Sequence, residues 1–346
     1  MPFIQIRDMD KIKNIVFKEK PVIIVGSISY EERCLAFFDV IKKLFSQEVK
    51  DQDIYAFKII DDESQYRDQA REFTERNFRK LVENYTLDIK TINCGLMEEE
   101  RSVKDLLDKI NSQYDEGYNL FVDLSTLPRR FLLEILKKFR LSKKTEKITI
   151  FYSTPVSYQQ PLLVRDLVVQ DLLQGRSLGG SERIAIVSLG LNDTQLKICI
   201  EHIEPISSII PIVPFPSTIV HEVLYRNDRH LKRWIDKVRE FKYVHLYNPS
   251  LLVEILEKDI IKPYTNIKNV SFSLIPLSTK AQALAIFVYG INNNINIVYA
   301  QPRTYKVPYS YGYNKFFIYQ ISKDSIGGAS TWLKIDSGIL TGKFPK

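Results

Sequence analysis

The stretch PVIIVGSISYEERCLAFFDVIKKLF, residues 21–45, predicts the fold of the first half of the chain. It begins with a short apolar run that ends at Gly26, which is typical of a buried strand. Apolar residues then recur at helical spacing at Leu35, Phe38 and Ile41. The same alternation continues to residue 152. Strands that are separated by helices form right-handed crossovers, so we expect a parallel sheet with helices on both faces.

The same patterns predict the elements of both halves, and the rhythm of the first half begins again near residue 184. In the first half we expect strands at residues 21–25, 53–60, 87–94, 120–124 and 147–152 and helices at residues 31–45, 65–85, 98–114 and 128–141. In the second half we expect strands at residues 184–188, 208–213, 243–247, 270–275 and 295–299, helices at residues 193–202, 217–241, 249–259 and 280–292, and a last strand at residues 316–321 that fits an antiparallel edge.

Two short motifs recur in the same order in both halves. LST occupies residues 124–126 and, 153 positions later, residues 277–279. YxxPxxY occupies residues 152–158 and, 147 positions later, residues 299–305. Repeats on matching elements indicate a tandem duplication. We predict an α/β fold of two tandem Rossmann-like domains, duplicated parallel-sheet units that form a pseudo-dimer.

The regular pattern breaks at a stretch that opens with Gln-Gln-Pro and closes with several glycines. We interpret this stretch as a linker. The predicted division is therefore a first Rossmann-like domain with a polar site at residues 1–160, a linker at residues 161–182, and a basic second domain with a degenerate site at residues 183–346.

Hydroxyl, acidic and arginine side chains follow the strands of the first half. Ligands of open parallel sheets bind outside the carboxyl ends of the strands, where the strand order reverses. Hydroxyls, arginines and the free N–H groups of helix N-termini suit a phosphate, and an acid after the second strand commonly binds a ribose hydroxyl. The candidate ligand-binding residues are Gly26, Ser27, Ser29, Arg33, Asp61, Asp62, Ser125, Thr126, Arg129, Thr154 and Tyr158.

Each of these features also fits a purely structural role. Ser29 and Glu32 form an S-x-x-E capping box, and Thr126 fits an N-cap. The acidic run at residues 61–63 fits a solvated turn, and Tyr158 fits packing at a domain junction. The prediction of a site therefore depends on the sheet bringing the ends of the first and fourth strands together.

The alignment of the two halves favours a working site in the first. The second half retains the scaffold and lacks most of the charged groups, whereas a purely structural role predicts similar loss in both. The aligned pairs are Glu31 with Asp193, Glu32 with Thr194, Arg33 with Gln195, Asp123 with Pro276 and Arg129 with Gln282.

Charge is uneven along the chain. Residues 1–163 carry equal numbers of basic and acidic residues, so the net charge of +7 falls in residues 164–346. Four basic residues of the expected helix at 217–241 follow three- and four-residue steps, and such a stripe can track phosphates of nucleic acid. A solvated helix face fits this pattern as well. The candidate nucleic-acid contacts are Arg226, Arg229, Arg233 and Lys237.

Several classes of protein are disfavoured. The sequence contains no G-x-G-x-x-G, P-loop, H-E-x-x-H or G-x-S-x-G motif, and its four histidines have no metal-ligand spacing, so we expect no metal site and no particular cofactor is indicated. Its three cysteines lie far apart, which favours a reducing cytoplasm over a disulfide framework. The chain has no apolar run long enough to span a membrane, so we expect no membrane partner.

Two segments, GSISYEER at residues 26–33 and DLSTLPR at residues 123–129, resemble Rossmann-like nucleotide-sensing domains of the CARF type and uncharacterised Rossmann-like proteins of bacterial defence loci. The resemblance implies a sensor or effector in antiviral defence. Together with the site residues, it predicts a cytoplasmic binding protein for a nucleotide or another phosphorylated small molecule.

Two alternative functions stay open at this stage. The first is a nucleotide hydrolase or glycosidase in which Glu31, Glu32 or Asp123 acts as the catalytic acid or base. The second is a subunit of a larger complex that contacts nucleic acid or a protein partner through its basic second half.

Overall fold

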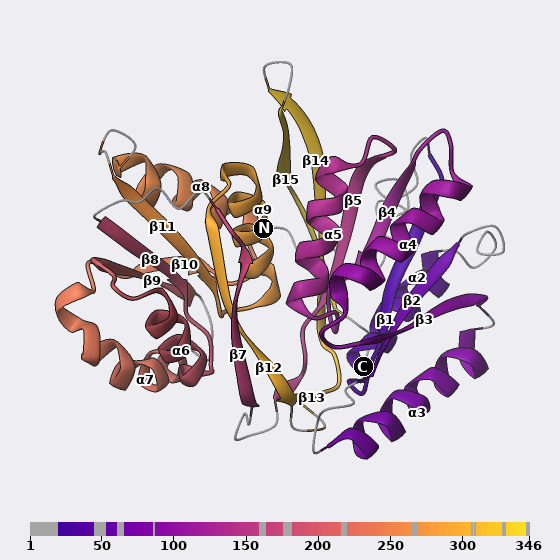
Figure 1. Cartoon of the computed structure of the whole chain (residues 1–346). Coiled ribbons are helices and arrows are strands. Elements are labelled where there is room, and N and C mark those ends of the chain that lie inside the picture. The colour runs from indigo at the N-terminus through magenta and orange to yellow at the C-terminus, as the bar shows by residue number, and fades with distance from the viewer. Residues whose placement is uncertain are drawn as a thin grey trace. The chain divides into compact units, whose positions relative to one another are not determined.

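A computed structural model of the chain contains two compact units (Figure 1), of which unit 1 comprises Met1–Leu163 and Arg303–Lys346 and unit 2 comprises Val164–Pro302. The structure describes residues 20–44, 53–60, 66–85, 87–158, 164–175, 182–215, 220–264, 267, 269–305, 307, 309–326 and 330–343.

Unit 1 is built on a seven-stranded mixed sheet. Its strands lie in the order β15 (Ser330–Lys343), β14 (Lys315–Ile326), β5 (Thr145–Ser153), β4 (Tyr118–Asp123), β1 (Val22–Ile28), β2 (Ile54–Ile60) and β3 (Ile89–Gly95). The pairings among β1 to β5 are parallel, and β14 is antiparallel to both β5 and β15. Its helices are α2 (Arg33–Leu44), α3 (Arg67–Tyr85), α4 (Glu99–Gln113) and α5 (Arg129–Leu141).

Helices pack on both faces of the first sheet. Phe37 of α2 contacts Phe121 and Phe151, with ring centroids 5.1 and 5.4 Å away. Phe131 of α5 contacts Phe57 at 5.2 Å. Because successive residues of a strand point to opposite faces, and the neighbour of Phe57, Ala56, belongs to the same core cluster as Phe37, α2 and α5 cover opposite faces.

Unit 2 repeats this strand order on a six-stranded sheet. Its strands lie in the order β10 (Lys242–His245), β9 (Ser208–Phe215), β8 (Glu182–Ser188), β11 (Val270–Pro276), β12 (Asn296–Tyr305) and β7 (Val164–Leu173). Its helical segments are α6 (Asp193–Ile203), α7 (Val220–Leu231), a 3-10 segment (Lys232–Lys237), α8 (Pro249–Ile255), a π segment (Leu256–Ile261), a second 3-10 segment (Lys262–Tyr264) and α9 (Lys280–Asn293).

The outer strands divide the chain differently from the sequence prediction. Part of the stretch expected to be a linker forms β7, which follows β5 in the sequence but lies beside β12. The strand expected at residues 316–321 is β14, which follows β12 but lies beside β5, flanked on its other side by β15. The antiparallel orientation was expected correctly, but β14 is no edge strand. Residues 303–346 therefore belong with the first sheet and not with a domain at residues 183–346.

Both corrections have a physical cause. Gly and Pro at the flanks of β7 favoured a linker, yet Leu167, Val169 and Leu172 pack against the core of unit 2. Local composition does not determine which sheet edge such a strand joins. β7 joins the sheet that contains β12, and β14 joins the sheet that contains β5. A short antiparallel ribbon is formed by β6 (Ser157–Tyr158), which precedes β7 in the sequence, and β13 (Ser310–Tyr311), which precedes β14.

Two other elements depart from expectation. The helix expected at residues 217–241 ends at Leu231, because Trp234 leaves the helical conformation, is buried and donates through Nε1 to Glu204 at 2.9 Å. The first strand continues past Gly26 to Ile28. Among the described residues, no helix has the length and hydrophobicity that crossing a membrane requires.

Candidate functional site

The candidate site lies at the carboxyl ends of β1 and β4 in unit 1. The sequence runs from β1 towards β3 on one side and from β4 towards β5 on the other, so the strand order reverses between β1 and β4. A hydrogen bond of 2.6 Å joins the hydroxyls of Ser27 and Thr126 across this point. Both side chains are buried. The sequence prediction that these two strand ends meet is confirmed.

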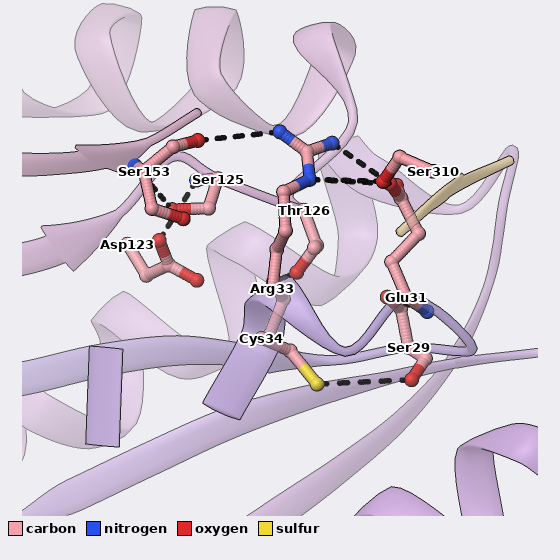
Figure 2. A network of polar contacts seen from close by, with 10 residues as sticks. Ser29, Glu31, Arg33, Cys34, Asp123, Ser125, Thr126, Ser153 and Ser310 are labelled. Atoms are coloured by element: carbon pink, nitrogen blue, oxygen red, sulfur yellow. Dashed lines mark hydrogen bonds and ion pairs between the residues drawn. The ribbon is translucent and has the colours of Figure 1, made fainter. Parts of the chain in front are cut away.

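A buried ion pair forms the centre of the cluster (Figure 2). Arg33 Nη2 donates to Glu31 Oε2 at 2.8 Å, and Arg33 Nε donates to the hydroxyl of Ser310 at 3.1 Å. Arg33 Nη1 donates to the main-chain oxygen of Ser153 at 3.2 Å, and the Ser310 hydroxyl donates to Glu31 Oε2. The side chains of Arg33 and Glu31 are only 4% and 10% exposed. Arg33 therefore fastens the start of α2 to β5 and β13.

Arg33 remains charged despite this burial. Burial alone would lower its pKa, but the neighbouring carboxylate of Glu31 outweighs that effect and the pKa is raised. A buried charge with several hydrogen bonds holds its geometry tightly, because loss of a partner leaves the charge uncompensated. The sequence predicted that Arg33 binds a ligand. In the structure, its guanidinium donates hydrogen bonds to groups of unit 1.

The loop after β4 is held by its own side chains. Asp123 Oδ1 accepts from the backbone N–H of Ser125 at 2.8 Å, and Ser125 Oγ accepts from the N–H of Ser153 at 2.8 Å. All three residues are fully buried. Thr154 also has a structural contact, because its Oγ1 accepts from the N–H of Lys315 at 3.3 Å. These residues connect the ends of β4, β5 and β14.

Ser29 organises the turn before α2. Its hydroxyl accepts from the N–H of Glu31 at 3.2 Å, and its carbonyl accepts from Asn77 Nδ2 at 2.9 Å. This hydroxyl bond goes to Glu31 and not to Glu32 as a capping box requires, and the carboxylate of Glu32 lies 3.4 Å from Lys80 Nζ on α3. Burial raises the pKa of Cys34 in the first turn of α2 to about 12, so its thiol stays protonated and unreactive.

Gly26 has a different role from the one expected, whereas Arg129 lies in the helix where it was expected. Gly26 lies within β1, where an added Cβ would approach the ring of Phe38 to 2.8 Å, so this glycine admits the helix and does not form a turn. Arg129 is the first residue of α5 and is half-buried. Burial raises the pKa of Tyr158, and the charges of Arg33 and Arg129 oppose that rise. Asp61 and Asp62 lie outside the described residues.

Sequence reasoning missed several members of the cluster. Ser310 is separated from Arg33 by 277 residues, and no local pattern connects them. Ser153 contributes its main-chain oxygen. Every residue type has this atom, so the sequence cannot indicate the contact. Asn77 had a weak signal, because a buried asparagine inside an amphipathic helix requires a polar partner.

The predicted basic stripe of unit 2 is ion-paired. The arginines at positions 226, 229 and 233 lie 2.6 to 2.7 Å from the carboxylates of Glu222, Asp193 and Glu201. Lys237 lies in the 3-10 segment beyond the end of α7. The positive charges therefore do not form one continuous helical face.

The corresponding edge of unit 2 has glutamines in place of both arginines and keeps one acid, Asp193. Gln195, which aligns with Arg33, donates through Nε2 to the main-chain oxygen of Ala300 at 2.6 Å. Ala300 lies 147 positions after Ser153, so the contact repeats with an amide in place of the guanidinium. Gln282, which aligns with Arg129, accepts from the hydroxyl of Ser188 at 2.8 Å.

The described residues contain no cluster of His, Cys, Asp and Glu that could hold a metal ion. No protein-family model matches the chain, and no curated protein matches it significantly.

Proposed function

We propose that unit 1 binds a small phosphate-bearing ligand of the nucleotide class at the carboxyl ends of β1 and β4. The observation that carries this proposal is the contrast between the two repeats. The first sheet has Glu31, Arg33 and Arg129 at the point where strand order reverses, and the second has neutral glutamines at two of these three positions.

Arg129 is the residue that we assign to the phosphate. It is half-buried in the first turn of α5, where backbone N–H groups point out of the helix. Pro128, the preceding residue, provides no side-chain hydrogen bond to these groups. A guanidinium and the positive end of a helix both favour an anion, and a charge-assisted hydrogen bond to phosphate is strong.

Arg33 has a positioning role in this proposal. Its bonds to Glu31, Ser310 and the main chain of Ser153 keep β13 and the end of β5 against the start of α2. The same bonds occupy the carboxylate of Glu31, which argues against Glu31 as a catalytic acid or base. We therefore propose binding and not turnover.

The test is nucleotide binding by Arg129→Gln, with Lys138→Gln in the last turn of the same helix as the matched control. We expect AMP or ADP to raise the melting temperature of the wild-type protein and Arg129→Gln to weaken their binding about tenfold. Lys138→Gln should bind like the wild type. The proposal is wrong if neither nucleotide nor inorganic phosphate binds, or if Arg129→Gln binds as tightly as the wild type.

We further infer that the two units arose by tandem duplication. The shared strand order, the placement of β7 beside β12 and of β14 beside β5, and the repeated contact at Arg33 and Gln195 support this inference. Under this history, unit 1 has kept the charged site and unit 2 has kept only its scaffold.

A further inference from the structure

Exposed aromatic side chains gather at one edge of the sheet of unit 2. β10 is the outermost strand of this sheet in the part of the chain that the structure describes. Tyr243 of β10 is 57% exposed, and Phe241, which directly precedes β10, is 40% exposed. Phe215, at the end of the neighbouring strand β9, is 53% exposed. Large apolar side chains at an outer sheet edge are typical of a surface that another strand covers.

These aromatic residues lie on one face of the sheet. The parallel register pairs Tyr243 with Val213 and His245 with Phe215. Cross-strand partners share a face, and so do residues two positions apart along a strand. Tyr243 and Phe215 therefore lie on the face of Val213, which belongs to the core of unit 2. The same alternation puts Phe241 on this face.

The main chain of β10 offers hydrogen-bonding groups on its outer side. Leu246 N–H donates to the main-chain oxygen of Phe215 at 2.9 Å, so this residue faces β9. Main-chain groups of successive strand residues point to alternate sides, which directs both groups of Tyr243 and the N–H of His245 away from β9. The carbonyl of His245 accepts from Asn248 N–H at 3.3 Å, where the strand ends. The outer edge is therefore centred on Tyr243.

The segment around Tyr243 brings no uncompensated charge to this edge. Lys242 Nζ lies 2.9 Å from Glu240 Oε1, and burial lowers the pKa of His245, so its ring is neutral at pH 7. The opposite edge strand of the same sheet, β7, carries the exposed acids Asp166 and Asp171. Charged side chains on an edge strand oppose pairing with another strand. Two copies of β10 can therefore approach each other without repulsion between like charges.

We propose that β10 pairs with the β10 strand of a second copy of this chain. The pairing is antiparallel about a two-fold axis that is perpendicular to the sheet and passes beside Tyr243. A two-fold axis places each residue on it opposite its own copy. Tyr243 then lies opposite Tyr243 of the second copy, and Phe241 lies opposite His245 of the second copy.

This pairing makes the exposed face complementary to itself. Because His245 lies beside Phe215 in the register of β9 and β10, these two residues and Phe241 of the second copy form one row across the joined sheet. The two-fold axis repeats this row on the other side of the tyrosine pair. Aromatic cross-strand pairs stabilise neighbouring strands, so a second copy covers all three exposed rings. The proposal goes beyond the phosphate site of unit 1 and is independent of it.

The test is sedimentation velocity over a range of protein concentrations. Three half-exposed aromatic side chains supply about 300 Å² per copy, less than the roughly 800 Å² of a standard interface, so we expect a dimer that dissociates in the micromolar range. Tyr243→Lys, which places two ammonium groups at the axis, should weaken dimerisation about tenfold, and Tyr243→Phe should retain it. Tyr225→Lys changes a tyrosine of α7 that is 84% exposed and is the matched control.

A cross-linking experiment tests the position of the axis. Equivalent Cα atoms in such a strand pair lie about 5.5 Å apart, which is within disulfide range. Tyr243→Cys should therefore form a disulfide-linked dimer under mild oxidation, and Tyr225→Cys should not. The three native cysteines are buried and do not compete.

Two results would overturn the proposal. A wild-type protein that stays monomeric at hundreds of micromolar, with no faster cross-linking of Tyr243→Cys than of Tyr225→Cys, would mean that copies of this chain do not cover β10. A dimer that Tyr243→Lys and Tyr225→Lys leave equally strong would have its interface elsewhere. Neither result affects nucleotide binding at Arg129, so failure of this proposal and failure of the proposed function are separate.

Discussion

An equivalent contact is present in unit 1 and in unit 2, formed by an arginine side chain in the first and by a glutamine side chain in the second. Near the start of α2 and α6, Arg33 in unit 1 and Gln195 in unit 2 each donate to a main-chain oxygen, that of Ser153 at the end of β5 and that of Ala300 within β12. The amide needs no counter-ion, whereas the guanidinium is buried beside Glu31. In unit 2 the aligned acid, Asp193, instead pairs with Arg229, whose side chain is 70% exposed.

This difference indicates that the strand–helix scaffold can form this contact without a charged side chain. A glutamine makes the same fastening contact at lower desolvation cost, since burying an ion pair costs more than burying an amide with its hydrogen bonds. The proposed binding site therefore explains the buried ion pair of Glu31 and Arg33 in unit 1 better than a gain in stability does. The predictions below test this comparison, beginning with the largest expected effect.

Glu31→Gln should destabilise unit 1 by about 3 kcal/mol, because it leaves the buried charge of Arg33 without its carboxylate. Asp193→Asn, at the aligned position of unit 2, should cost less, about 1 kcal/mol, because Arg229 is exposed to solvent and burial lowers the pKa of His230, which lies 3.3 Å from Asp193 and is neutral at pH 7. Urea unfolding of both variants measures the difference.

A double variant sharpens this first prediction. Glu31→Gln with Arg33→Gln imitates the neutral chemistry of unit 2, so it should recover part of the stability that Glu31→Gln loses. Equal stability of Glu31→Gln and Asp193→Asn would contradict the contrast between a buried and an exposed pair.

A repeated asparagine contact should give similar effects in the two units. Asn77 Nδ2 donates to the carbonyl of Ser29 at 2.9 Å, and Asn227 Nδ2 donates to the carbonyl of Gly190 at 2.8 Å. Both asparagines are fully buried. Asn77→Ala and Asn227→Ala should each lower the free energy of unfolding by about 1–2 kcal/mol, because a buried carbonyl loses its donor. Urea titrations that find one substitution neutral would refute the structural equivalence of the two helices.

The smallest effect concerns the buried thiols, which behave alike in both units. Burial raises the pKa of Cys34 and of Cys199 to about 12 from an ordinary value near 9. Above pH 9 the unfolded chain loses these protons while the folded chain keeps them, so stability falls as pH rises towards 12. At pH 10 the loss should be about 1 kcal/mol per thiol.

Unfolding at pH 8 and pH 10 measures this loss, with the Cys34→Ala, Cys199→Ala double variant as the control. The double variant should lose less stability between the two pH values than the wild type. An identical loss in both proteins would show that these thiols are not the groups that titrate.

The local pattern of apolar and polar residues was enough to predict most helices and strands of unit 1. The apolar run at residues 21–25 and the helical spacing after it predicted β1 and α2, and the same reasoning predicted the parallel order of β1 to β5. The meeting of Ser27 with Thr126 was expected because parallel strands end at one edge of a sheet, and it requires in addition that β1 lies beside β4, as it does in the structure. The repeated LST and YxxPxxY motifs predicted two similar units.

The same reasoning was less successful where a residue's neighbours come from distant sequence. It placed Gly26 among the ligand-binding residues, although the packing of Phe38 explains that glycine. It predicted that Arg33 binds a ligand, although the guanidinium of Arg33 donates hydrogen bonds to Ser310 and Glu31. In each case the residue type indicated a special role, but the sequence did not indicate which residues are its neighbours in space.

The sequence by itself predicted most of the helices and strands and several residues of the polar edge, because periodicity and turn chemistry act over a few residues. Only the tertiary structure decided that β7 lies beside β12, that β14 lies beside β5, and that Ser310 lies beside Arg33. The physical reason is that a strand carries the same hydrogen-bonding groups whichever sheet edge it joins. The choice between edges depends on the packing of the whole chain.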